Sequence, residues 1–281
     1  MRRRIRSVQT TSQITRAMEM VAASKMKRAQ SMAIASRPYS DRMGELLNRL
    51  AATLVGHNSA APCPLLEWRE RRVVGLTVIT ARGGLCGSLN SNVIRQAETF
   101  ILDQNRPVKV LAVGRKGRDW MVRHGHNVIA EFAEVPDRPT LVDTRPISRT
   151  LIDRYIRGEI DEVHVVHSQF VSTLIQRPVV RHLLPIEPAE SSAPLTEYIF
   201  EPDAGEILTR LLPRYVEVQV YQALLEAIAS EQSARMVAMR NATDNARKLT
   251  NDLSLRLNRA RQNSITAEII EIAAGAEVLV A

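Results

Sequence analysis

Apolar residues recur every three or four positions over the first part of the chain. Residues 1–37 contain neither Gly nor Pro. Their apolar row consists of Ile14, Met18, Ala22, Met26, Ala29 and Ala33. This spacing is typical of one face of an α-helix. After Pro38 the row resumes at Met43, Leu47, Leu50 and Leu54. We therefore predict an N-terminal helix over 1–56, which Pro38 kinks without ending it.

The C-terminal part of the chain repeats this pattern over a greater length. Residues 214–274 contain no Gly or Pro, and as one helix they extend roughly 90 Å. Their apolar seam consists of Met239, Ala242, Ala246, Leu249 and Leu253. One such helix cannot bury its seam alone, so we predict that the N-terminal helix folds back as its antiparallel partner. Two successive steps of four, from Leu249 to Leu257, predict a shallow supercoil there.

Between the two helices the apolar period changes to that of strands. Runs rich in Val, Ile and Leu occupy 72–80, 108–114, 127–133 and 162–170. Helical patterns occupy 91–104, 117–123 and 141–157. This βαβ alternation predicts a parallel sheet. We expect 175–188 to form a hairpin arm or an edge strand, because Pro178 and Pro185 exclude a central strand. Residues 191–205 are the predicted linker to the last helix.

These patterns predict an α/β fold with three parts. They are an N-terminal coiled-coil helix over 1–56, a central Rossmann-like α/β domain over 65–200, and a C-terminal coiled-coil helix over 206–281. The two terminal helices form a long antiparallel coiled coil. The low aromatic content of 4% agrees with long helices that pack through small and straight-chain residues.

Composition also excludes several classes of protein. The two cysteines, Cys63 and Cys86, are too few for a disulfide framework or a cysteine-based zinc site. No segment approaches the ~20 apolar residues of a membrane span. The basic N-terminus lacks the apolar stretch of a secretory signal. We therefore predict a soluble, intracellular protein.

A glycine-rich segment, 82–90, follows the first predicted strand, where a phosphate-binding loop would lie. It lacks the Lys-Ser/Thr pair of a P-loop and does not match the dinucleotide-binding glycine pattern, so a tight turn explains it more simply. Cys86 would be a nucleophile only beside a base, and the sequence indicates none. We expect it to be a buried small residue.

The histidines and carboxylates show no catalytic arrangement. His164 and His167 lie three apart in a predicted strand and face opposite sides. His124 and His126 have no third ligand nearby in the sequence. The carboxylates form no pair suited to acid–base chemistry. We predict no catalytic residue, no cofactor and no metal.

The positive charge is concentrated at the N-terminus. The first fifty residues carry eleven Lys/Arg against three Asp/Glu, which accounts for the whole net charge of +8. Basic residues also lie along the last predicted helix, at Arg235, Arg240, Arg247, Lys248, Arg256, Arg259 and Arg261. Such a surface attracts a polyanion or an acidic protein. A coiled-coil nucleic-acid-binding protein is one alternative, although a recognised motif and stacking aromatics are missing.

Several segments resemble a known family over essentially the whole chain. They are ITRAMEMVAASKM (14–26), GLCG (84–87), ARMVAM (234–239), ATDN (242–245), ARQ (260–262) and ITAE (265–268), followed by Glu271 and Gly275-Ala276. These segments are similar to the gamma subunit of bacterial F-type ATP synthases. The chain departs from the family pattern at Arg82, at Ser88 and in a few N-terminal residues. It lacks the cysteine-bearing insert of chloroplast members.

The resemblance implies a non-catalytic rotary shaft. Such a subunit turns inside a hexamer of alpha and beta subunits, and its foot docks with the epsilon subunit on the membrane rotor ring. The implied location is peripheral, at the cytoplasmic face of the bacterial plasma membrane. Neither nucleic acid nor a second copy of the chain is an implied partner. The positions implied to contact beta or to affect coupling are Met18, Lys25, Lys27, Arg28, Arg235, Arg261, Gln262, Thr266 and Glu268.

Two other functions stay open at this point. Charge alone favours nucleic-acid binding, which strongly salt-dependent association with duplex DNA would support. A nucleotide-dependent enzyme built on the α/β domain is the other, and nucleotide binding by residues 65–200 would support it.

Overall fold

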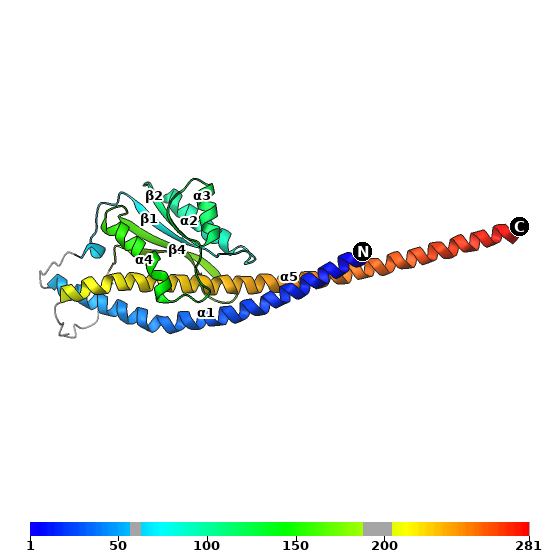
Figure 1. Cartoon of the computed structure of the whole chain (residues 1–281), viewed down its shortest axis with the longest axis horizontal. Coiled ribbons are helices and arrows are strands. Elements are labelled where there is room, and N and C mark those ends of the chain that lie inside the picture. The colour runs from blue at the N-terminus through cyan, green and yellow to red at the C-terminus, as the bar shows by residue number, and fades with distance from the viewer. Residues whose placement is uncertain (57–62, 188–203, 281) are drawn as a thin grey trace. The chain divides into compact units, whose positions relative to one another are not determined.

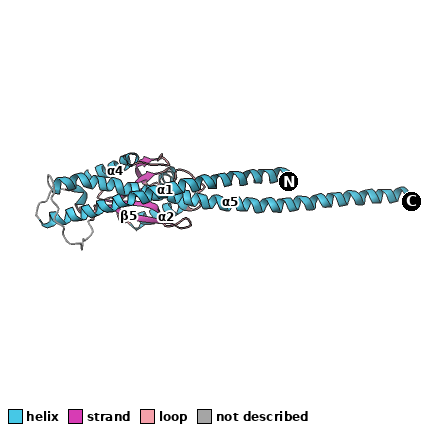
Figure 2. Ribbon diagram, turned by 90° about the horizontal axis from the view of Figure 1, so that it is seen from below, coloured by secondary structure: helices cyan, strands magenta, loops and turns pink. Residues whose placement is uncertain are grey.

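A computed structural model describes residues 1–56, 63–187 and 204–280 (Figures 1 and 2). Two long helices, α1 (Arg2–Gly56) and α5 (Ala204–Val280), accompany a five-stranded sheet, three shorter α-helices and one short 3₁₀ helix. The chain forms two compact units. One consists of Met1–Val21 and Met236–Ala281, and the other of Ala22–Arg235. Most of the predicted linker lies outside the described residues, as does the side chain of Leu54.

The sheet has the order β3-β2-β1-β4-β5. The strands are β1 (Val74–Ile79), β2 (Val108–Val113), β3 (Asn127–Phe132), β4 (Glu162–Phe170) and β5 (Gln176–Leu184). The first four are parallel, as predicted, and β5 pairs antiparallel with β4 at the edge. Pro178 lies opposite Ser168, a place where the missing N–H of proline is tolerated. The α/β prediction is confirmed.

Helices cover both faces of this sheet (Figure 1). On one face, α2 (Leu89–Asp103) and α3 (Arg115–Arg123) enclose the core formed by Leu76, Val78, Val93, Ala97, Val110, Met121 and Val166. On the other face, α4 (Leu141–Ile156), the short helix Pro64–Leu66 and the first part of α5 build a larger core. Its buried residues include Leu111, Ile147, Leu151, Val165, Leu212 and Val216. Burial of these side chains is the main stabilising contribution to the unit.

Local chemistry sets several element boundaries. Thr140 and Asp143 form a capping box that starts α4, which satisfies backbone donors at that end. The Asp161 carboxylate accepts hydrogen bonds from the backbone of Arg72 and Val73, each at 2.9 Å, just before β1. Gly114 has φ +94°, and a Cβ atom there would lie 2.1 Å from the carbonyl oxygen of Thr80. Only glycine fits this turn between β2 and α3.

Within the unit Ala22–Arg235, α1 and α5 run antiparallel. The Ser36 hydroxyl lies 2.6 Å from Gln222 Oε1, and Gln219 donates to the Ser40 hydroxyl at 3.3 Å. The buried positions of α1 here are Ala22, Ala29, Ala33, Met43, Leu47 and Leu50. The helix continues through Pro38, as predicted. Apart from Met26, which is only half-buried, the predicted apolar row is therefore buried wherever its side chains are described in this unit.

In the unit formed by Met1–Val21 and Met236–Ala281, α1 and α5 also run antiparallel, and α5 continues alone beyond the start of α1 (Figure 1). Thr15 and Thr243 meet through their hydroxyl oxygens at 2.7 Å, and Arg240 donates to Glu19 at 3.0 Å. Two predicted seam positions are wrong, because Ile14 is 55% exposed and Leu249 is 41% exposed. Thr15 and Thr243 occupy the seam in place of larger apolar side chains. Burial is possible because each hydroxyl donates a hydrogen bond to a backbone carbonyl of its own helix.

Candidate functional site

The surface of the helix pair Met1–Val21 and Met236–Ala281 is strongly basic. Its exposed cations are Arg2, Arg3, Arg4, Arg6, Arg16, Arg240, Arg247, Lys248, Arg256, Arg259 and Arg261. Arg240 pairs with Glu19, and Arg247 lies 3.7 Å from Asp244. The other cations form no salt bridge with any described residue. Because no acidic side chain among the described residues neutralises these other cations, this surface is suited to an acidic partner.

The predicted coupling residues near the C-terminus lie on this basic helix. Arg261, Gln262, Thr266 and Glu268 are all exposed on α5. Gln262 and Thr266 are four residues apart and share a face, whereas Arg261 and Glu268 share another. Met18, on α1, is half-buried. The exposed guanidinium and amide offer forked hydrogen bonding to a partner.

Another predicted position, Lys25, lies beside a carboxylate in the unit Ala22–Arg235. Lys25 forms a salt bridge with Asp137, and its hydrogen bond holds the pKa of Asp137 below the usual value. The positive charges of Arg82 and Arg235 lower that pKa further. Lys25 is therefore partly neutralised within the chain. Lys27 and Arg28 are exposed and form no salt bridge with any described residue, so their positive charges face solvent.

Arg235 connects α5 to the glycine-rich loop. Its guanidinium pairs with Glu231 and donates to the carbonyl oxygen of Gly84 at 3.4 Å. In the same loop, Leu85 has φ +63° and is 59% exposed. The sequence alone could not predict this contact, because Arg235 and the glycine-rich loop lie about 150 positions apart.

Cys86 is a structural residue of this loop. It is buried, and Asn90 holds the loop by accepting from the backbone N–H of Ala81 and donating to the Gly83 carbonyl. Burial raises the pKa of the Cys86 thiol, so the reactive thiolate is disfavoured. This environment agrees with the prediction of a buried small residue.

His167 joins the sheet to α5. It faces away from His164, as the strand spacing predicted, and its Nε2 lies 3.1 Å from Glu226 Oε2. Arg181 of β5 donates to both oxygens of Glu226, at 3.1 and 3.4 Å. Burial lowers the pKa of His167. Burial alone raises the pKa of Glu226, but His167 and Arg181 outweigh it and leave that pKa below its usual value.

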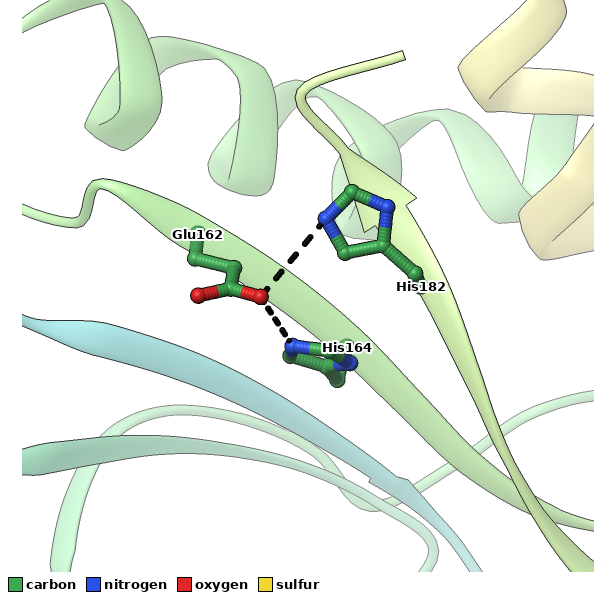
Figure 3. A group of neighbouring side chains, drawn as sticks. All are labelled: Glu162, His164 and His182. Atoms are coloured by element: carbon green, nitrogen blue, oxygen red, sulfur yellow. Dashed lines mark hydrogen bonds and ion pairs between the residues drawn. The ribbon is translucent and has the colours of Figure 1, made fainter. Parts of the chain in front are cut away.

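A second histidine cluster lies on the opposite face of β4 and β5 (Figure 3). Glu162, His164 and His182 bring one donor atom each to within 4.8 Å of one another. No spacing in the sequence indicates this group, and the sequence predicts no metal site. His182 is 18 positions from His164, and only the antiparallel register of β4 with β5 places the two residues opposite each other.

No helix among the described residues has both the length and the apolar content of a membrane span.

Comparison with known proteins gives consistent matches. A family model described as ATP synthase matches residues 1–279. The ATP synthase gamma chain of Roseiflexus sp. (strain RS-1) is 52% identical, and the alignment covers 99% of this chain and 97% of the relative. That of Dehalococcoides mccartyi (strain CBDB1) is 50% identical, with the same coverage.

Solved structures agree with these matches. A chain of the central stalk and c-ring structure of Tetrahymena thermophila mitochondrial ATP synthase has a TM-score of 0.64 and 25% identity. The match covers 82% of this chain and 99% of that one. A chain of the Euglena gracilis OSCP/F1/c-ring structure, in rotational state 3, has a TM-score of 0.59 at 15% identity, covering 96% and 95%. The second likeness concerns the fold alone.

Proposed function

The chain belongs to the gamma-chain family of ATP synthases, and we propose that it is the central rotary shaft of an F-type enzyme. The observation that carries this proposal is the match to curated gamma chains over almost the whole chain. In this function the chain turns inside the catalytic head and couples ion flow through the membrane rotor ring to ATP synthesis or hydrolysis. It is a subunit of the complex and contributes no catalytic residue of its own.

The antiparallel helix pairs suit the transmission of torque. Each long helix satisfies its backbone hydrogen bonds internally, and each is held to the other by a buried seam and by contacts such as Thr15 with Thr243. Close packing of that seam opposes sliding of one helix along the other. A twisting force applied to one helix is thereby shared by both.

The basic surface suits contact with acidic segments of the beta subunits. We propose that Lys27 and Arg28, with Met18 and Lys25, meet these segments along α1. A lysine ammonium is a compact charge on a flexible chain and tolerates movement of its partner. Because Lys25 is already paired with Asp137, we assign the larger share of the attraction to Lys27 and Arg28.

The exposed residues near the C-terminus suit a contact that depends on the rotor angle. A guanidinium pairs with a carboxylate in a planar, bidentate geometry. We assign this contact with beta to Arg261 and Gln262, with Thr266 and Glu268 adjusting the coupling. Arg235, which holds the glycine-rich loop, completes the proposed set.

The remaining partners are proposed from the family. They are the alpha subunits, the epsilon subunit and the membrane rotor ring, and the α/β domain is the part that we place nearest the ring. The location is then peripheral, on the cytoplasmic face of a bacterial inner membrane. The nucleic-acid-binding alternative has no support from the comparisons.

Co-purification tests the proposal. The full chain is co-expressed with its own alpha and beta subunits, and a tag on beta is used for capture. We expect the chain in the captured complex, at a lower molar amount than beta, as a single shaft in a hexamer requires. Active alpha–beta complexes that exclude the chain would contradict the proposal.

A further inference from the structure

Glu162, His164 and His182 converge at one edge of the sheet (Figure 3). Glu162 and His164 are two residues apart on β4 and therefore point to the same face. His182 on β5 is the cross-strand partner of His164, and a register shift beside this pair separates it from the pairing of Val163 with Leu184. Such a bulge changes which side chains face each side of the sheet, and here it brings the two imidazoles together.

The donor atoms gather around one carboxylate oxygen. Glu162 Oε1 lies 2.8 Å from His164 Nε2 and 3.8 Å from His182 Nε2. His182 Nε2 is buried and has no hydrogen-bond partner among the described residues. A buried polar atom without a partner is rare in folded proteins and calls for an explanation. A metal ion bound to this nitrogen would supply one.

We propose that Glu162, His164 and His182 form a binding site for a divalent transition-metal ion of the Zn²⁺ class. Two imidazoles and one carboxylate suit Zn²⁺, Co²⁺ or Ni²⁺ far better than Mg²⁺ or Ca²⁺, which take oxygen ligands. Zinc bonds of about 2.0–2.2 Å in a tetrahedral site place ligand atoms roughly 3.3 Å apart. The observed separations of 2.8 and 3.8 Å bracket this value. Three protein ligands leave the fourth position to water.

Neighbouring charged residues leave His182 Nε2 and Glu162 Oε1 free to bind a metal ion. Glu187 Oε1 lies 3.6 Å from His182 Nδ1, which favours the proton on Nδ1 and leaves the Nε2 lone pair free for a metal. Arg71 lies 3.5 Å from Glu162 Oε2, so Oε1 is the oxygen available to the ion. Binding also requires His164 to carry its proton on Nδ1 rather than on Nε2.

Two aromatic side chains hold the imidazoles in place. Trp68 stacks on His182 with the ring centres 6.2 Å apart, and Phe100 of α2 packs against His164 at 4.7 Å. The side chains of Glu162, His164 and His182 are 9, 15 and 25% exposed, so the cluster lies close to the surface of the domain. An ion at this site would fasten the edge strand β5 to β4 and stabilise the α/β domain.

Titration of the full chain with Zn²⁺ tests the site, using a fluorescent zinc indicator as competitor at pH 7.5. We expect one tight site per chain, and a higher melting temperature when Zn²⁺ is bound. His182→Gln and His164→Gln should each weaken binding by roughly a hundredfold or more, and Glu187→Gln by about tenfold. The matched control is His126→Gln, which removes a histidine outside the cluster and should leave the affinity unchanged.

Two further measurements make the result decisive. Circular dichroism of each variant without metal checks that the fold is intact. Co²⁺ bound to the unaltered chain should show the visible absorption of a four-coordinate site with nitrogen and oxygen ligands. Failure of Zn²⁺ to bind, or binding that His182→Gln and His126→Gln weaken equally, would overturn the proposal. Neither outcome bears on the proposed rotary function.

Discussion

Replacing Glu226 by alanine removes the carboxylate that links α5 to the sheet. Glu226 accepts from His167 at 3.1 Å and from Arg181 at 3.1 and 3.4 Å. The His167 side chain is fully buried, and its Nδ1 already lacks a partner among the described residues. In Glu226→Ala both ring nitrogens of His167 would therefore be unpaired in the core.

The structure sets the size of the expected effect. An unpaired buried donor costs about 1–3 kcal/mol. Arg181 is 36% exposed, so its guanidinium regains water and adds little to the loss. Truncating the Glu226 side chain also leaves a cavity, which the surrounding residues fill only in part. We expect Glu226→Ala to lower the free energy of unfolding of the α/β domain by about 2–4 kcal/mol.

Urea unfolding at pH 7.5, followed by tryptophan fluorescence, measures this loss. The chain has two tryptophans, Trp68 and Trp120, and both belong to the unit that contains Glu226. Glu45→Ala is the matched control, because its pair with Arg42 is exposed and should contribute under about 1 kcal/mol. If Glu226→Ala is no more destabilising than Glu45→Ala, the linking role assigned to this carboxylate is wrong.

Three other predictions concern function and pH. Arg261→Ala combined with Gln262→Ala should slow steady-state ATP hydrolysis about tenfold without loss of assembly, whereas Lys27→Ala should have little effect at moderate salt; a larger effect of Lys27→Ala would refute the assignment. Met18→Lys should impair proton pumping more than ATP hydrolysis, since a new ammonium seeks a carboxylate on beta; unchanged pumping per ATP would refute it. Because burial lowers the pKa of His167, the unfolded chain binds the proton more readily, and stability should fall as the pH drops below about 6.5. His167→Gln should reduce that loss between pH 7 and 5 in urea unfolding, and an unchanged loss would count against this origin.

Periodicity alone was enough to predict the arrangement of elements. The first four strands begin and end within about two residues of the predicted runs, whereas β5 ends four residues before the end of the predicted run 175–188. The alternation of strands and helices predicted the parallel sheet correctly. The seam of the helix pair was harder to predict. Hydrophobicity favours Ile14 and Leu249 for the seam, but Thr15 and Thr243 are buried instead. Their hydroxyls are satisfied by backbone carbonyls and by each other.

Contacts between distant segments could not be predicted from one sequence. Two such contacts join separate elements of the fold. They are the salt bridge of Lys25 with Asp137 and the cluster of Glu162, His164 and His182. A one-residue change in strand register would move His182 to the other face. The coupling residues on α5 came from family resemblance, and their roles stay predictions until the variants are assayed.

Single-molecule rotation shows whether the chain is a rotary shaft. The alpha–beta head is fixed to a surface, and a probe is attached through Leu102→Cys, a position that is 76% exposed on α2, with Cys63→Ser removing the partly exposed thiol. Cys86 is buried, and burial raises its thiol pKa, so it should escape labelling. On addition of ATP, we expect unidirectional, stepwise rotation of the probe. A probe that stays still while the same complexes hydrolyse ATP at full rate would contradict it.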